Sequence, residues 1–363
     1  MADALVVKPD TRFIRDVMAA GGEDLKKCYQ CATCSVVCEL SPDDAPFPRR
    51  QMLHAQWGLK DRLVADPAVW LCHNCRECSE KCPRGARPGD VLGAVRSQVI
   101  RAFAFPGFMG RAVASPAALP LLFLLPIVIF ALMAMAAPGA EPGEPLEFAQ
   151  LFPIAWLEGL FFTISTLALL GFAVGIARFV SALKAAGLPP LTLAALAAAL
   201  VEIGRHDRFA TCEHPTARYW GHLLTFWGFM GLAVMGTVVG IGTMLGLMHT
   251  PLEFWSAWKV FANLSAVAIL VGAIVLLAAR LGDAEARAHS TYFDWLFLLT
   301  LIGVAATGIT AEVLRLGQVA AAMYPVYFVH LVLIFSLFLY APYSKFAHLA
   351  YRTVAVAATG RRR

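Results

Sequence analysis

Polar and apolar residues are distributed unevenly along the chain, which divides it into two parts. From Met1 to about Arg111 apolar residues occur in short groups among polar ones, whereas longer apolar stretches follow. A stretch of roughly 20 apolar residues is long enough to cross a bilayer as a helix. We therefore expect a polar domain over residues 1–111 and a transmembrane domain of about six helices over residues 112–363. The predicted spans are approximately Ala117–Ala137, Ile154–Ala177, Tyr219–Met248, Trp255–Ala279, Trp295–Val313 and Tyr324–Leu349.

One further apolar segment is too short to be counted among the spans. Leu191–Ile203 is rich in alanine and follows Pro189 and Pro190. We expect an interfacial or buried helix here, because it falls short of the length that a bilayer requires.

Charged residues in the loops predict how the spans are oriented. Lysine and arginine are enriched in loops on the cytoplasmic side of a membrane, and here basic residues fall in alternate loops. The basic positions are Arg101, Arg111, Arg178, Lys184, Arg205, Arg208, Arg218, Arg280, Arg287, Arg352 and Arg361 to Arg363. The opposite loops contain Glu141, Glu144 and Glu147 and one arginine, Arg315. We expect a multi-pass protein of the inner membrane with the polar domain and both termini in the cytoplasm.

Composition supports a membrane protein and argues against a nucleic-acid partner. Hydrophobic residues make up 59% of the 363 residues, charged residues only 15%, and the mean hydropathy is +0.65. These values lie outside the range of ordinary soluble domains. The formal net charge of +5 comes from basic residues beside apolar segments, where such residues set membrane orientation. We therefore expect contact with lipid and none with nucleic acid.

Eight of the nine cysteines form two runs with the same spacing, C-x-x-C-x-x-C-x-x-x-C. This pattern is typical of proteins with two 4Fe-4S clusters, in which each run gives three thiolates to one cluster and its fourth to the other. The first cluster would be bound by Cys28, Cys31, Cys34 and Cys82. The second would be bound by Cys72, Cys75, Cys78 and Cys38. The polar part is therefore expected to be a helical ferredoxin-type domain.

Other uses of these cysteines are less consistent with the pattern. A structural zinc ion needs four ligands and gives no reason for two repeated runs of four. A disulfide framework would require an oxidising compartment, and the first residues lack the apolar core of a signal peptide. Covalent haem attachment needs C-x-x-C-H, whereas the chain has arginine after Cys75. His73 is interpreted as a neighbour that tunes a cluster.

Histidines in the apolar half indicate a second kind of redox centre. Ionisable residues inside a membrane are costly and commonly functional, and the last predicted span contains both His330 and His348. Their separation of 18 residues is five helical turns, so we expect both to face one direction, roughly 27 Å apart along the helix. One histidine near each side of the membrane is the arrangement expected of a cytochrome b with two haems.

Each of these histidines needs a partner at the same depth to hold a haem. His222 lies near the inner end of the third predicted span, so we pair it with His348 on an inner haem. The fourth ligand, the partner of His330, is either His249 or His206. His249 has the required depth but lies on the opposite helix face from His222, and His206 lies on the cytoplasmic side. Catalytic residues and the residues of a quinone site are left unassigned.

Two segments resemble known families of redox subunits. The segment from Cys28 to Ser97 is similar to the iron-sulfur C subunit of heterodisulfide reductases. The segment HLVLIFSLFLYAPYSKFAH, which begins at His330, resembles the last haem-binding helix of the cytochrome b (gamma) subunit of respiratory nitrate reductases. Leu232 stands where that subunit has a second histidine, and Glu39 stands where related cysteine runs often have proline. The fusion of both modules resembles the membrane subunit (QmoC) of quinone-interacting membrane-bound oxidoreductase complexes.

This resemblance implies a function in electron transfer. Such a subunit moves electrons between the quinone pool, menaquinone or ubiquinone, and adenylylsulfate (APS) reductase through flavin-containing iron-sulfur partner subunits. The chain lacks a G-x-G-x-x-G fingerprint that opens a helix after a strand, so the flavin is expected on the partners. Two alternatives remain open: the same relay serving a heterodisulfide-reductase-like or sulfite-reduction partner, and a structural membrane anchor with zinc in the cysteine runs.

Overall fold

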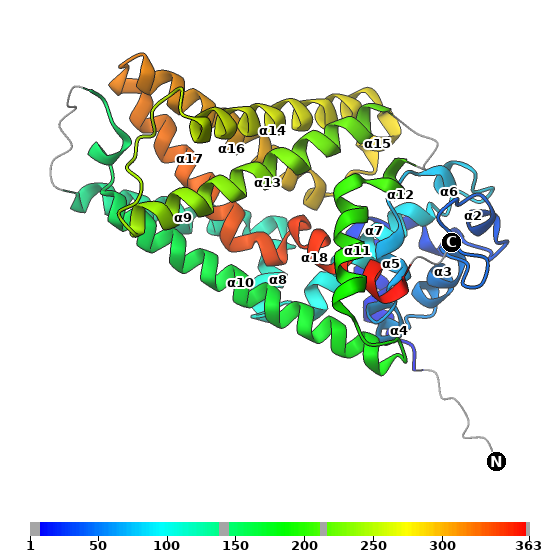
Figure 1. The fold of residues 1–363 in the computed structure, drawn as a ribbon. Helices are drawn as coiled ribbons and strands as arrows, with labels where there is room; N and C mark the ends of the chain where they lie inside the picture. Colours follow the sequence, from blue (N-terminus) through cyan, green and yellow to red (C-terminus); the bar gives the residue numbers. More distant parts are fainter. Residues whose placement is uncertain (1–7, 138–144, 211–215, 361–363) are drawn as a thin grey trace.

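The chain folds into helices in the computed structural model, which describes residues 8–137, 145–210 and 216–360 (Figure 1). Within these residues no strand occurs, so the predicted all-α class is confirmed. Six helical segments are long and apolar enough to cross a membrane, which agrees with the predicted number and is consistent with a multi-pass membrane protein. They are Pro116–Ala136, which includes α9 (Leu119–Ala136), α10 (Ile154–Ala185), α13 (Thr216–Met244), α14 (Ala257–Gly282), α16 (Tyr292–Leu316) and Ala320–Tyr343, which includes α17 (Ala320–Tyr340).

Short helices build the polar domain around one longer helix. The cysteine runs form loops between these helices, and α7 packs against several of them. Asp10 caps the first helix by accepting a hydrogen bond from the Phe13 backbone N–H at 2.8 Å. The elements are α1 (Thr11–Val17), η1 (Met18–Gly22), η2 (Glu23–Lys27), α2 (Thr33–Val36), α3 (Arg49–Gln56), α4 (Lys60–Val64), α5 (Ala68–Leu71), α6 (Glu77–Glu80), α7 (Pro88–Phe103) and α8 (Gly107–Val113).

Glycines allow the closest helix pair of the membrane part, α13 and α14, to approach. A Cβ atom at Gly228 would lie 2.6 Å from the Ser265 carbonyl oxygen. A Cβ atom at Gly272 would lie equally close, at 2.6 Å, to the Gly221 carbonyl oxygen. Because van der Waals contact replaces the hydrophobic effect between helices in lipid, small residues are favoured at such interfaces.

The last predicted span is not one continuous helix, and this corrects the prediction that His330 and His348 lie in phase on one helix face. Helix α17 ends at Tyr340, and two 3-10 turns follow, η5 (Ala341–Tyr343) and η6 (Lys345–Ala347). A new helix, α18 (His348–Thr359), then begins at His348. Pro342 lies in the first turn and cannot donate a backbone hydrogen bond, which ends the helical ladder. The chain therefore changes direction between the two histidines (Figure 1).

Helix α18 leaves the membrane bundle and packs into the core of the polar domain. Tyr351 stacks on Trp70 with ring centroids 5.2 Å apart, and Trp70 is completely buried. The same apolar cluster includes Phe179 from α10 and Val95 from α7. Helix α11 (Leu193–Arg205) also lies against α18 and matches the predicted short helix. One continuous core thus joins the polar domain to the membrane part.

Candidate functional site

The two cysteine runs adopt the same backbone conformation. Gln30 and Asn74, two residues after the first cysteine of each run, have φ values of 60° and 53°. Ala32 and Arg76, four residues after that cysteine, have φ values of 69° and 78°. Non-glycine residues adopt such left-handed values infrequently, and they concentrate at functional sites. The repeated conformation turns each loop around its cysteines and leads into a short helix, α2 or α6.

Four thiols from different parts of the polar domain surround one small cavity. Cys28, Cys31 and Cys34 of the first run line it together with Cys82, the last cysteine of the second run. Burial raises the pKa of the Cys34 thiol to about 11, and the neighbouring sulfur atoms of Cys28, Cys31 and Cys82 act in the same direction. The structure thus brings together the set that the spacing predicts for a first cluster.

The remaining four cysteines form the complementary group. Burial raises the pKa of Cys38 to about 12, with additional contributions from Cys72 and Cys75. Burial also raises the pKa of Cys78, and Cys72, Cys38 and Cys75 add to the shift. Cys38 of the first run therefore lies among the first three cysteines of the second run. The ninth cysteine, Cys212, lies outside the described residues.

The donor set around these sulfur atoms fits iron-sulfur clusters. Backbone N–H groups of Asn74 and Ala86 donate to Sγ of Cys72 and Cys82 at 3.2 and 3.4 Å. The Gln30 side-chain amide donates to Sγ of Cys28 at 3.3 Å. Donors of this kind stabilise thiolates and tune a cluster that they bind. Burial among other sulfur atoms raises the pKa of the Cys34, Cys38 and Cys78 thiols, so as free groups they stay protonated, whereas bound iron would stabilise their thiolate form.

Two arginines hold the loop of the second run, Arg218 on the membrane helix α13 and Arg352 on α18. Arg352 of α18 donates to the Cys72 carbonyl oxygen at 2.7 Å and to Nδ1 of His73 at 2.7 Å. Arg218 of α13 donates to the carbonyl oxygens of His73 and Asn74 at 2.8 and 2.6 Å. Burial lowers the pKa of Arg352 to about 9, which leaves the guanidinium charged at neutral pH. The loop of the second run is therefore fixed against α13 and α18.

His222 and His348 lie close together with their rings facing across a short gap. Their ring centroids are 6.4 Å apart and their planes are inclined at 73°. Because an imidazole nitrogen binds a metal at about 2 Å, two imidazoles on opposite sides of one iron have centroids roughly 6 Å apart. Nδ1 of His348 lies 2.6 Å from the Lys345 carbonyl oxygen, and Nδ1 of His222 lies 2.8 Å from Nε2 of His206. No hydrogen bond within the described residues engages either Nε2 atom, so His222 and His348 would be able to hold the iron of one haem.

The local environment keeps these imidazoles in the form that binds metals. Burial lowers the pKa of His348 to about 3, and burial also lowers the pKa of His206. Neutral imidazole is the metal-binding form of histidine. The structure thus places His222 with His348, as the depth argument predicts, and adds His206 to the same group.

His330 lies elsewhere in the bundle and has a different environment. Its Nδ1 atom is 3.0 Å from Oγ1 of Thr307 on α16, and its ring rests against Gly308. Across the described ranges, no hydrogen bond or ring contact joins His330 to another histidine. His249 is exposed in the turn after α13. Neither candidate for the fourth ligand lies beside His330. His206 contacts His222 instead, and no contact between His249 and His330 occurs among the described residues.

A line of aromatic contacts connects the second cysteine loop to the histidine pair. The rings of His73 and Phe209 have centroids 5.4 Å apart, and those of Phe209 and His222 are 5.3 Å apart. Phe209 belongs to α12 (Asp207–Ala210), the short helix after α11. His73 directly follows Cys72, so this line runs from a candidate cluster ligand to a candidate haem ligand.

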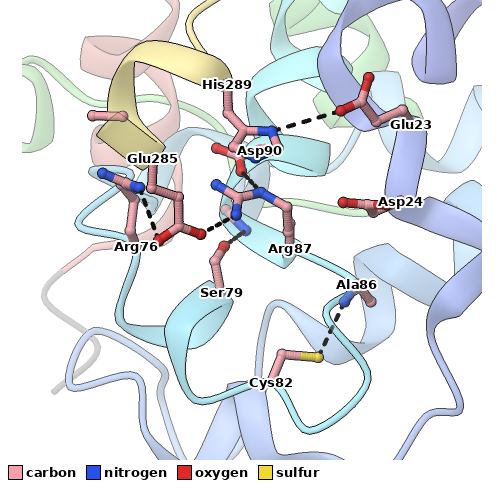
Figure 2. Close-up of polar contacts among 12 residues, drawn as sticks. Glu23, Asp24, Arg76, Ser79, Cys82, Ala86, Arg87, Asp90, Glu285 and His289 are labelled. Atoms are coloured by element: carbon pink, nitrogen blue, oxygen red, sulfur yellow. Dashed lines mark hydrogen bonds and ion pairs between the residues drawn. The ribbon is translucent and has the colours of Figure 1, made fainter. Parts of the chain in front are cut away.

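An acidic segment between α14 and α16 forms a clamp of ion pairs on the polar domain (Figure 2). Arg76 pairs with Asp283 at 2.5 Å and with Glu285 at 3.5 Å. Arg87 pairs with Glu285 and, at 2.7 Å, with Asp90. Asp283 and Glu285 stand at the end of α14 and in α15 (Ala284–Ala288). Arg76 lies within the second cysteine run, so this clamp also acts on the loop that faces the membrane part.

Sequence reasoning missed the roles of Arg352, Arg218 and Phe209. The two arginines entered only as markers of loop orientation. Arg352 follows His348 by four residues, which places both on one face of a helix, and this spacing was the available signal. No local pattern singles out Phe209, because its contacts come from three separate segments.

Comparison with known proteins assigns the polar domain. Residues 24–86 match the family of 4Fe-4S dicluster domains. The chain is 39% identical over 104 residues to the C subunit of the H(2):CoB-CoM heterodisulfide,ferredoxin reductase of Methanothermobacter thermautotrophicus. It is 31% identical over 96 residues to a protein of Archaeoglobus profundus that is itself described as similar to the C subunit of heterodisulfide reductase. These matches cover 28% and 26% of this chain, and they span about half the relatives' length, 54% and 51%.

A third relative is similar over nearly the whole chain. Citrate utilization protein B of Escherichia coli is 29% identical in an alignment of 359 positions that covers 92% of this chain and 89% of that protein. No solved structure matches the chain. The polar domain therefore resembles the C subunit of heterodisulfide reductases, which is an iron-sulfur electron-transfer protein. The similarity to Citrate utilization protein B extends over both the polar and the membrane part.

Proposed function

We propose that this protein is the membrane electron-transfer subunit of a quinone-dependent oxidoreductase complex. The observation that carries the proposal is the line of contacts from Cys72 through His73 and Phe209 to His222. When bound, two 4Fe-4S clusters and haem b, with one haem at His222 and His348, would accept and release single electrons. Cys28, Cys31, Cys34 and Cys82 would hold the first cluster, and Cys38, Cys72, Cys75 and Cys78 the second. His330 would serve a second haem near the other side of the membrane.

The positions of the two cysteine groups indicate the order in which electrons would pass between the protein surface and the membrane. The cavity of the first cysteine group opens beside Tyr29 and Arg84, of which Tyr29 is 69% exposed. The second group lies nearer the membrane part, held by Arg218 and Arg352. A soluble partner would therefore exchange electrons at the first group, and quinone would exchange them with haem in the bilayer. Either direction of net flow is compatible with this order.

Two observations favour different soluble partners. The resemblance to membrane subunits of quinone-interacting oxidoreductase complexes favours flavin-containing iron-sulfur subunits that serve APS reductase. The similarity to Citrate utilization protein B over 92% of the chain favours a partner that acts in citrate utilization. We prefer the second partner, because the similarity to Citrate utilization protein B extends over both parts of the chain, whereas the heterodisulfide reductase matches cover 28% and 26% of it.

One purification tests the relay and the partner together. The native complex is purified anaerobically, its iron, zinc, haem and subunits are determined, and its optical and EPR spectra are recorded. We expect haem that a menaquinol or ubiquinol analogue reduces, 4Fe-4S signals, and a co-purifying flavoprotein that identifies the partner. Zinc in place of iron, together with absence of a haem Soret band, would refute the relay and favour a structural anchor.

We also propose that the polar domain and both termini face the cytoplasm, because basic residues are concentrated in the loops on the same side as the polar domain and such loops are enriched on the cytoplasmic side of membranes. A reporter fused after Arg363 tests this orientation. Fluorescence of a fused green fluorescent protein is expected, whereas activity of fused alkaline phosphatase would place the C-terminus outside.

A further inference from the structure

His206 is a buried histidine at the end of α11 that has no role in the proposed relay. It ends α11 as the C-cap residue and has a φ of 58°, a left-handed value more typical of glycine at this position. Its side chain points inward, and the residue is only 6% exposed. The ring lies against Phe226 and Tyr219, with centroids 5.2 and 6.3 Å away. A buried polar side chain on strained backbone needs a specific partner to offset its cost.

The hydrogen bonds of His206 determine which of its nitrogens carries the proton. Nδ1 lies 3.4 Å from the Gly204 carbonyl oxygen, and this oxygen can only accept, so Nδ1 donates. Trp227 Nε1 donates to the same oxygen at 3.2 Å and holds it in place. In a neutral imidazole with a protonated Nδ1, Nε2 is an acceptor. His222 must therefore donate from its own Nδ1 across the 2.8 Å contact.

We propose that His206 is a positioning residue for His222, holding that imidazole with Nδ1 protonated and Nε2 directed toward iron. The inference rests on the proposed function and deepens it. Metal-bound histidines commonly donate their second ring N–H to such a partner, which fixes the ring and raises ligand basicity. His206 is thereby removed from the candidates for the fourth haem ligand.

The geometry separates this role from that of a ligand. The 2.8 Å between Nε2 of His206 and Nδ1 of His222 is a hydrogen-bond distance. A metal between these atoms would need about 4 Å, two bonds of about 2 Å each. His348 instead faces His222 across a gap that suits such a metal, with centroids 6.4 Å apart. The two neighbours of His222 therefore have different functions.

Substitution of His206 in the full-length complex tests the inference. Loss of the acceptor makes His222 a weaker donor to iron, so in His206→Ala the haem midpoint potential should rise. Haem affinity should fall about 10- to 100-fold, as for other outer-shell partners of metal ligands. His206→Gln retains an acceptor oxygen and should restore both values toward those of the native protein. His222→Ala should lose this haem completely.

The readouts are haem content, redox titration of the haem spectrum and the EPR g-values of the ferric haem. Iron-sulfur content in the same samples reports folding, and His289→Ala serves as a matched control outside the histidine group. Unchanged potential and affinity in His206→Ala would refute the inference alone. Loss of haem as complete as in His222→Ala, with intact clusters, would make His206 a ligand and also refute it. A native protein without haem would refute the proposed function and this inference together.

Discussion

At the scale of single residues, Cys38 and Cys82 distinguish a crossed arrangement from two independent cluster sites. Each lies in one run but among the thiols of the other. We predict that Cys82→Ser removes the first cluster and leaves the second, and that Cys38→Ser has the opposite effect. Iron analysis and EPR of the reduced protein measure this, with Cys212→Ser as the control. Loss of the second cluster in Cys82→Ser would show that each run binds its own cluster.

His348 and His330 should also be separable by substitution. His348 lies with His222, whereas His330 contacts Thr307 and Gly308 in another part of the bundle. We predict that His348→Ala and His222→Ala remove the same haem, and that His330→Ala lowers haem content independently of them. The haem content of His222→Ala/His348→Ala should equal that of either single variant. Unchanged haem in His348→Ala would contradict the pairing.

At the scale of helices, the pairing of α13 with α14 depends on residues without side chains. A Cβ atom at Gly228 would lie 2.6 Å from the Ser265 carbonyl oxygen and 2.9 Å from the Ile269 backbone nitrogen. Gly228→Ala should destabilise the protein by about 1–3 kcal/mol, because the backbones must separate. Thermal unfolding in detergent measures the effect.

Gly236 provides the matched control on the same helix. A Cβ atom there would meet nothing within 4 Å, and alanine is favoured over glycine in a helix by about 1 kcal/mol. Gly236→Ala should therefore leave the unfolding temperature unchanged or raise it. Equal destabilisation by both variants would show that helix contact is not the cause.

At the scale of the whole molecule, the acidic clamp fixes the polar domain on the membrane part. Glu285 contacts both Arg76 and Arg87 (Figure 2). In Glu285→Lys three cations would meet, so the second cysteine loop should move away from the membrane helices. We predict slower oxidation of quinol-reduced haem by the clusters, with haem and iron contents unchanged. Stopped-flow spectroscopy measures this rate.

The control for this charge reversal is Asp61→Lys, which makes the same change in net charge at an exposed position on α4. The rate in that variant should equal the native rate. A native rate in Glu285→Lys as well would show that the clamp is not needed and that the other contacts, such as those of Arg218 and Arg352, hold the second loop in place.

Local properties of the sequence determined much of this protein. Six apolar stretches of bilayer length predict six helices, because the need to satisfy backbone hydrogen bonds in lipid leaves few other solutions. The repeated cysteine spacing predicts a 4Fe-4S domain, because ligands of one cluster must lie within a few residues or be crossed between runs. Both predictions rest on patterns that can be read within short segments of the sequence.

Only the tertiary structure decided how these parts meet. Arg352 reaches the Cys72 carbonyl oxygen across 280 positions of sequence. His206 contacts His222 because the C-terminal end of α11 lies against α13, where Trp227 donates to the Gly204 carbonyl oxygen. The break after Tyr340 turns α18 out of the bundle and separates His330 from His348, although their spacing suits one helix. Spacing along a chain determines which residues share a helix face, whereas packing between helices determines which side chains touch.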